Sequence, residues 1–199
     1  VGTESMQRLR PTTSDSAQLL RDVPGVTLNG AGGLSSLPAI RGLADDGLRV
    51  KLDGMDLIAT CPNHMNPPLS YVDPSNLEAL TVYAGISPVS VGGDSIGGTI
   101  IAETPAPEFA AVGTGSLSKG EFGASYGSNN DAYSANLTGT YATEVLNLTY
   151  SGAWSEADNY TAGGDFKSDK ATGRLGHTLP LDEVGSTAYE TWNHTLGIA

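Results

Sequence analysis

The sequence predicts a small α+β domain followed by antiparallel strands of a transmembrane β-barrel. Residues 1–112 mix short helix signals with isolated strands, whereas residues 113–199 alternate apolar and polar side chains with a period of two. Alternation over about ten residues, ending in aromatic side chains and joined by short polar turns, is typical of outer-membrane barrels. We therefore expect two parts, 1–112 and 113–199.

The composition narrows the classes of function. The chain has 22 acidic and 10 basic side chains and a net charge of −12, which argues against nucleic acid as a partner. Its one cysteine, Cys61, cannot form an internal disulfide. No apolar run reaches the roughly 18 residues that a transmembrane helix needs. A catalytic constellation is also missing, so we expect no enzymatic activity.

Local signals define the elements of the first part. Ser14 is a candidate N-cap for a helix over 15–23, which Pro24-Gly25 would end. Asp73-Pro74 predicts a second, short helix through Leu77. We expect strands at 26–28, 48–53, 80–84 and 98–102, with a glycine-rich loop at 29–33. These elements predict an α+β domain with long loops.

The second part contains four alternating segments. Residues 133–141 and 146–154 alternate clearly, 119–126 lie before them, and 188–198 alternate more weakly. Residues 155–185 break the pattern and predict a long extracellular loop. The apolar face would contact lipid, although a soluble β-sandwich with inward aromatic side chains also alternates. Four strands cannot close a barrel, and an open edge would leave backbone groups unpaired in hydrocarbon, so we expect a fragment.

Five segments occur in an order that is typical of one family. They are AQLLRDVPGV at 17–26, IRG at 40–42, VKLDG at 50–54, NLEALTV at 76–82 and SIGGTI at 95–100. From Asp15 to Thr104 the chain resembles the plug domain of TonB-dependent outer-membrane receptors. The resemblance implies an α+β plug domain followed by the first antiparallel strands of a barrel of about 22 strands, whose wide lumen needs a plug. It also implies a bacterial outer-membrane location, contact with lipid, and TonB as a partner through an N-terminal segment.

The segment Cys61-Pro62-Asn63-His64-Met65 contains the candidate site. Among these receptors, a Cys-x-x-x-Met in a plug loop resembles the copper-binding OprC/NosA group, which implies copper as the ligand. Thiolate and thioether are soft donors that suit Cu(I), and one helical turn would let both sulfurs converge. His64 is a further candidate ligand. The resemblance implies that other His and Met ligands come from a barrel segment beyond Ala199.

We expect Cys61 and Met65 in an irregular or one-turn helical segment on the extracellular side of the plug, with their sulfurs within about 5 Å of each other. The alternative is that both side chains pack between plug and barrel. Asp45, Asp46 and Asp56 suit hard cations, and we interpret them as solvated loop residues. Arg41 is expected to pair with carboxylates of the plug or the barrel wall.

Two other functions stay open. A receptor of the same family could take up a siderophore, cobalamin or another organic ligand through extracellular loops. A secreted β-rich binding or adhesion module would carry out no transport at all.

Overall fold

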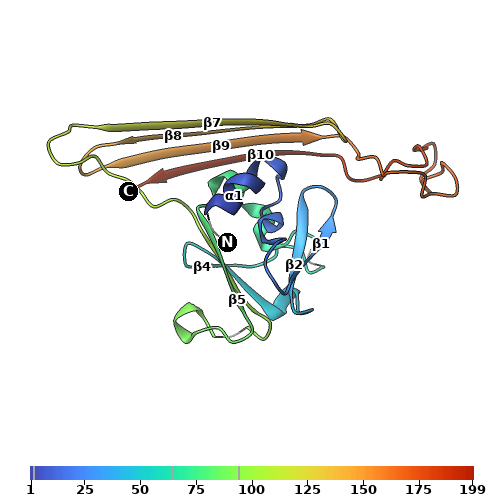
Figure 1. The fold of residues 1–199 in the computed structure, drawn as a ribbon, viewed down its shortest axis with the longest axis horizontal. Helices are drawn as coiled ribbons and strands as arrows, with labels where there is room; N and C mark the ends of the chain where they lie inside the picture. Colours follow the sequence, from blue (N-terminus) through green and yellow to red (C-terminus); the bar gives the residue numbers. More distant parts are fainter. Residues whose placement is uncertain (2, 64, 94) are drawn as a thin grey trace.

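Four long strands form an antiparallel sheet that covers one side of the N-terminal part of the chain (Figure 1). The computed structural model describes residues 1, 3–63, 65–93 and 95–199. The bounds of these strands are β7 Leu117–Gly127, β8 Ala132–Ala142, β9 Asn147–Ala157 and β10 Tyr189–Ile198. The sheet order is β10-β9-β8-β7, so neighbours in sequence are neighbours in the sheet. This confirms the prediction of consecutive antiparallel strands with open edges.

The alternation turns polar side chains toward the N-terminal domain and apolar ones away from it. In β9, Asn147 and Ser155 are buried, whereas Leu148 and Tyr150 are exposed. The face that carries Leu148 and Tyr150 also exposes Phe122, Tyr126, Tyr133, Leu137, Tyr141, Trp192, Leu196 and Ile198. The aromatic side chains therefore point outward, which is the opposite of what a closed sandwich would require.

Polar side chains connect the sheet to the N-terminal domain. Ser14 donates a hydrogen bond from its Oγ to Oγ of Ser155, at 2.7 Å. The Nδ2 group of Asn76 donates to Asn193 Oδ1 at 3.2 Å and to Thr195 Oγ1 at 3.4 Å. Hydroxyl and amide groups thus form these contacts between the two parts.

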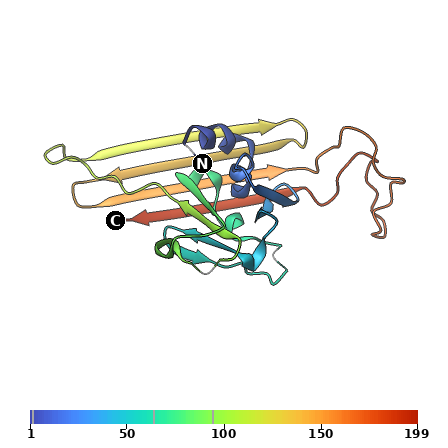
Figure 2. The same ribbon diagram turned by 60° about the horizontal axis from the view of Figure 1, so that its bottom comes forward.

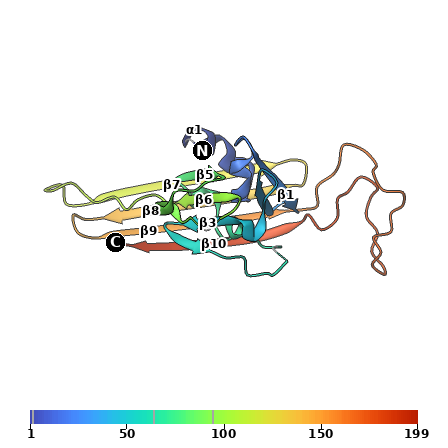
Figure 3. The same ribbon diagram turned by 90° about the horizontal axis from the view of Figure 1, so that it is seen from below.

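The N-terminal domain combines a hairpin, a mixed sheet and short helices (Figures 2 and 3). β1 pairs with β2, and a second sheet has the order β4-β3-β6-β5, in which β3 and β6 run parallel. The bounds are α1 Thr3–Leu9, β1 Val26–Ala31, β2 Ser35–Ile40, β3 Leu48–Leu52, β4 Met55–Leu57, β5 Ala79–Ala84 and β6 Gly98–Glu103, and the 3-10 helices are η1 Arg10–Thr12, η2 Ser16–Leu20, η3 Asp45–Gly47, η4 Pro68–Tyr71, η5 Pro74–Asn76 and η6 Val89–Val91. None of the helices formed by the described residues has the length and apolarity that crossing a membrane requires.

One apolar core holds this domain together. Met6 of α1, Leu20 of η2 and Ile100 of β6 are fully buried in it. The other members are Leu9, Ala17, Leu19, Val26, Ile40, Val50, Leu69, Val72, Leu77, Leu80 and Ala102. Fully burying one large apolar side chain contributes about 1.5–3 kcal/mol, so the core is the main source of stability for this domain.

The first predicted helix differs from expectation in type and in cap. Residues 16–20 form a 3-10 helix, and Asp15 rather than Ser14 caps it, because the Asp15 side chain accepts a hydrogen bond from the backbone N–H of Ala17. Ser14 instead directs its hydroxyl to Ser155 of the sheet. The observed cap is therefore one residue later than predicted, and the predicted cap residue makes a contact with the sheet instead. The second helix is confirmed: Asp73 caps η5, accepting from the Ser75 N–H at 2.8 Å.

β2 was not predicted, because Pro38 stands in its middle. Proline cannot donate to a ladder and is tolerated only where its missing N–H faces no partner strand. β2 pairs only with β1, and Pro38 lies opposite Leu28, so one side of the strand is free of a ladder. The hairpin also extends β1 to Ala31, into the segment that was expected to be a loop.

Asp15 is a buried acid beside this hairpin. Its side chain is 2% exposed, and burial raises the pKa of its carboxyl from 3.8 to about 6. Hydrogen bonds from Ser36, Ala17 and Gln18 favour the charged form and offset only part of the burial effect. The folded domain therefore holds this proton more tightly than the unfolded chain does.

Because of Asp15, the free energy of unfolding of the N-terminal domain should fall as the pH rises from about 4 to about 6. The loss of this stabilisation should be complete above about pH 6. A shift of about two pKa units corresponds to about 3 kcal/mol. Asp15→Asn, which is neutral at every pH, should remove this slope. Hydrogen-exchange protection of residues 15–40 in the full-length protein, corrected for intrinsic exchange, measures this change in stability with pH. A variant that keeps the wild-type slope would show that Asp15 is not the group responsible.

Candidate metal-binding loop

The predicted site lies in the irregular segment between β4 and η4. Cys61 is partly buried, and Met65 is 64% exposed. His64 lies outside the described residues. The two flanking segments, 57–59 and 68, both line a cleft in the domain surface. The irregular conformation agrees with expectation, whereas the distance between the two sulfurs stays a prediction.

A hydrogen bond connects the segment to the β1–β2 hairpin. Ser35, at the start of β2, donates from its Oγ to the carbonyl oxygen of Met65 at 3.1 Å. The tip of the hairpin, Gly32 and Gly33, lies against the beginning of β10. A Cβ on Gly33 would come within 2.7 Å of Cε1 of Tyr189, so a larger residue at this position would force the tyrosine ring or the tip to shift. The hairpin thus contacts both the candidate loop, through Ser35, and the sheet, through Gly33.

This end of the sheet carries the long connection, residues 158–188, between β9 and β10. The opposite end has only the short turn 143–146 between β8 and β9. Outer-membrane barrels have short periplasmic turns and longer extracellular loops, so the expected barrel would have the end with residues 158–188 on its extracellular side. In Figures 1–3 the hairpin lies in the half of the domain nearer to this connection.

Asn159 organises the base of the long connection. Its Oδ1 accepts hydrogen bonds from the backbone N–H groups of Thr187 at 3.0 Å and Ala188 at 2.9 Å. Its Nδ2 donates to Glu183 Oε1 at 2.6 Å. One side chain therefore joins the two ends of the connection, and Thr187, one of its partners, lies near Gly32 of the hairpin tip.

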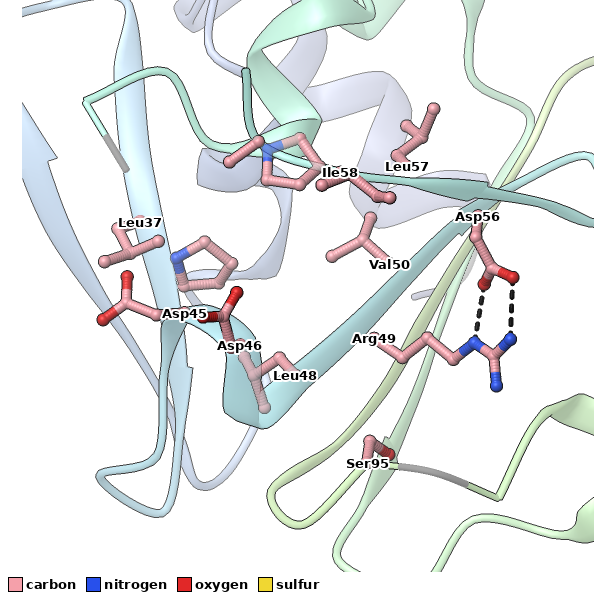
Figure 4. A pocket seen from close by; sticks show the side chains of 13 residues that line it. Leu37, Asp45, Asp46, Leu48, Arg49, Val50, Asp56, Leu57, Ile58 and Ser95 are labelled. Atoms are coloured by element: carbon pink, nitrogen blue, oxygen red, sulfur yellow. Dashed lines mark hydrogen bonds and ion pairs between the residues drawn. The ribbon is translucent and has the colours of Figure 1, made fainter. Parts of the chain in front are cut away.

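A cleft of about 340 Å³ lies beside the candidate loop (Figure 4). Leu57, Ile58 and Ala59 form part of its lining, together with Asp45 and Asp46 from η3. The remaining lining residues are Leu37, Pro38, Leu48, Arg49, Val50, Asp56, Pro68 and Ser95. The cleft thus joins the base of the loop to an acidic surface.

Arg49 and Asp56 form a bidentate ion pair at the cleft. The Arg49 Nε and Nη2 groups donate to the two Asp56 oxygens at 2.6 and 2.7 Å. These hydrogen bonds hold the pKa of the Asp56 carboxyl below its usual range. We had expected Asp56 to be a solvated loop residue. It is instead paired with Arg49.

Arg41 lies at a sharp turn after β2. Its φ is 52° and that of Gly42 is 83°. Its side chain is exposed, and Nη1 lies 3.5 Å from the place a Cβ on Gly85 would take. Pairing of Arg41 with carboxylates stays a prediction.

The charged and imidazole or thiol donors of the described residues form no larger metal-binding cluster. No group of three or more His, Cys, Asp or Glu side chains that could hold a metal ion occurs there. His194 lies on the outward face of β10, where its Nδ1 is 2.8 Å from the Tyr150 hydroxyl. Cys61 and Met65, with His64 as a further candidate, stay the predicted donors.

Comparison with known proteins defines the class. Residues 1–99 match the model of the TonB-dependent Receptor Plug Domain family. The copper transporter OprC has a TM-score of 0.75 and 25% identity, over 94% of this chain and 26% of that one. The FrpB iron transporter from Neisseria meningitidis (F3-3 variant) has a TM-score of 0.72 and 20% identity, over 100% of this chain and 28% of that one. The pyoverdine outer membrane receptor FpvA from Pseudomonas aeruginosa, bound to pyoverdine, has a TM-score of 0.61 and 17% identity, over 83% of this chain and 22% of that one. No curated protein matches the chain.

The chain belongs to the TonB-dependent receptor family and consists of a plug domain followed by strands that resemble the start of the barrel. It spans about a quarter of the length of the solved receptors that it matches. TonB-dependent receptors are outer-membrane transporters of Gram-negative bacteria and not enzymes. The expected family, location and lack of enzymatic activity are confirmed.

The outward face of β9 should contact lipid. We expect a spin label at position 148 in the full-length receptor, in a cysteine-free background, to collide mainly with oxygen, because oxygen dissolves in the bilayer. A label at position 149, on the inward face, should collide mainly with a water-soluble nickel complex. Val145, which is 86% exposed in the turn 143–146, is the aqueous control. The reverse preference at 148 and 149 would mean that the sheet is turned the other way.

Proposed function

We propose that the chain is part of a receptor that takes up copper across the outer membrane, and that Cys61 and Met65 bind the ion. The observation that carries the proposal is the pair of soft donors in an irregular plug loop near the extracellular end. Thiolate and thioether favour Cu(I) and discriminate against hard cations. The similarity to OprC, at 25% identity over nearly the whole chain, supports the same ligand.

The two sulfurs are an incomplete coordination set. Cu(I) bound by one thiolate and one thioether would take further soft or imidazole donors from the barrel beyond Ala199. His64 is a further candidate within the loop itself. The cleft beside the loop would give the ion an acidic surface, since Asp45 and Asp46 contribute to its lining.

Transport would use TonB as the energy-coupling partner. TonB would act on a segment N-terminal to α1, and α1 is anchored in the plug core through the fully buried Met6. A pull on this segment would therefore be transmitted to the core rather than to the loop directly.

Uptake of a siderophore, cobalamin or another organic ligand is the alternative. The fold similarity to FrpB and FpvA is compatible with this alternative. At 20% and 17% identity, however, the similarity concerns the fold alone and does not favour a particular ligand. The plug match speaks against a secreted adhesion module. The soft donor pair favours copper over the organic ligands.

Removal of the sulfurs should remove the copper. Cys61→Ala should lower the copper affinity of the full-length receptor more than Met65→Ala, because a thiolate carries charge and a thioether does not. We expect the double variant, purified from copper-supplemented cells, to contain little copper by elemental analysis. Met55→Ala is the matched control, since Met55 is 62% exposed in the same domain. Wild-type copper content in the double variant would leave the two sulfurs with a packing role.

A further inference from the structure

Both ends of the candidate loop meet at one hydroxyl group. The Tyr71 OH lies 2.9 Å from the backbone nitrogen of Thr60 and 2.8 Å from the Thr60 Oγ1. The same OH lies 2.9 Å from the carbonyl oxygen of Asn66. Thr60 immediately precedes Cys61, and Asn66 immediately follows Met65. A single side chain therefore joins the two residues that flank the Cys-x-x-x-Met segment.

The three contacts use the full hydrogen-bonding capacity of a phenol. A tyrosine hydroxyl has one proton to donate and lone pairs that accept. The carbonyl of Asn66 can only accept, so it takes the Tyr71 proton. The backbone N–H of Thr60 can only donate, and the Thr60 hydroxyl donates as well. All three hydrogen bonds can thus exist together.

Tyr71 sits on a firmly held support. It is the last residue of η4, whose Leu69 is fully buried in the core. The Ser70 Oγ donates to the carbonyl of Pro67 at 2.7 Å, and Ser16 donates to the carbonyl of Val72. The phenol is therefore a fixed point to which the exposed loop is attached.

We propose that Tyr71 is a positioning residue for the copper site. By holding Thr60 and Asn66 together, its hydroxyl closes the loop from 61 to 65 before any ion arrives. Closure reduces the conformational freedom that the two sulfurs lose when they bind one ion, and preorganisation of this kind raises affinity. This role rests on the proposed copper function, whereas closure of the loop does not.

Closure can be tested without metal. Tyr71→Phe keeps the ring and removes only the hydroxyl. In the metal-free full-length receptor we expect maleimide to label Cys61 about fivefold faster in this variant, as judged by mass spectrometry of the Cys61 peptide. Tyr160→Phe is the matched control, because Tyr160 is 40% exposed and Tyr71 is 38% exposed. Equal labelling rates in wild type and Tyr71→Phe would overturn the proposal.

Copper binding tests the positioning role. Cu(I) affinity, measured by competition with a chromophoric chelator, should fall about tenfold in Tyr71→Phe and stay unchanged in Tyr160→Phe. Thr60→Ser, which keeps both donors to the phenol, should retain wild-type affinity, whereas Thr60→Val should lose part of it. An unfolding temperature that equals that of wild type shows that the variant is folded.

The outcomes separate the two proposals. Wild-type copper affinity in Tyr71→Phe, together with copper loss in the Cys61→Ala, Met65→Ala double variant, overturns the role of Tyr71 and leaves the copper site. Copper retained by the double variant overturns the copper site itself. Faster labelling and weaker binding in Tyr71→Phe support both.

Discussion

The two-residue alternation of β7 to β10 is the constraint on which the rest of the structure depends. A strand that is exposed to hydrocarbon on one face and to a polar domain on the other can satisfy both only in one phase. Asn147 and Ser155 are therefore buried against the plug side, and Leu148 and Tyr150 face away from it. A shift of one residue would turn these polar groups to the outward face of the sheet. The phase of the sheet thus fixes which surface the plug can occupy.

Hydrogen bonds between polar side chains join the plug to the sheet, whereas the plug itself has an apolar core. Ser14 meets Ser155, and Asn76 meets Asn193 and Thr195, through single hydrogen bonds. A typical hydrogen bond contributes only about 0.5–1.5 kcal/mol net, because water can replace either partner. The core, which includes Met6 and Leu20, is costly to open by comparison. Breaking these hydrogen bonds to the four strands therefore costs less than opening the plug core.

The sequence predicts the regular elements well, because their signals are local. Alternation located the four long strands, and Asp73-Pro74 marked η5. Prediction from the sequence failed where tertiary contacts determine the local structure. Asp15 rather than Ser14 caps η2, while the Ser14 hydroxyl bonds to Ser155, and Pro38 in the middle of β2 is not a strand signal. Cys61 and Met65 were found through the family resemblance and soft-donor chemistry. Tyr71 gave no signal, since its role depends on the direction in which η4 presents the phenol to residues 5 and 11 positions earlier.

Copper K-edge X-ray absorption of the full-length receptor loaded with one equivalent of Cu(I) tests the central claim most directly. If the loop from 61 to 65 supplies a thiolate and a thioether to one ion, the spectrum contains two sulfur neighbours at about 2.3 Å. A first shell of nitrogen and oxygen atoms alone would contradict the account.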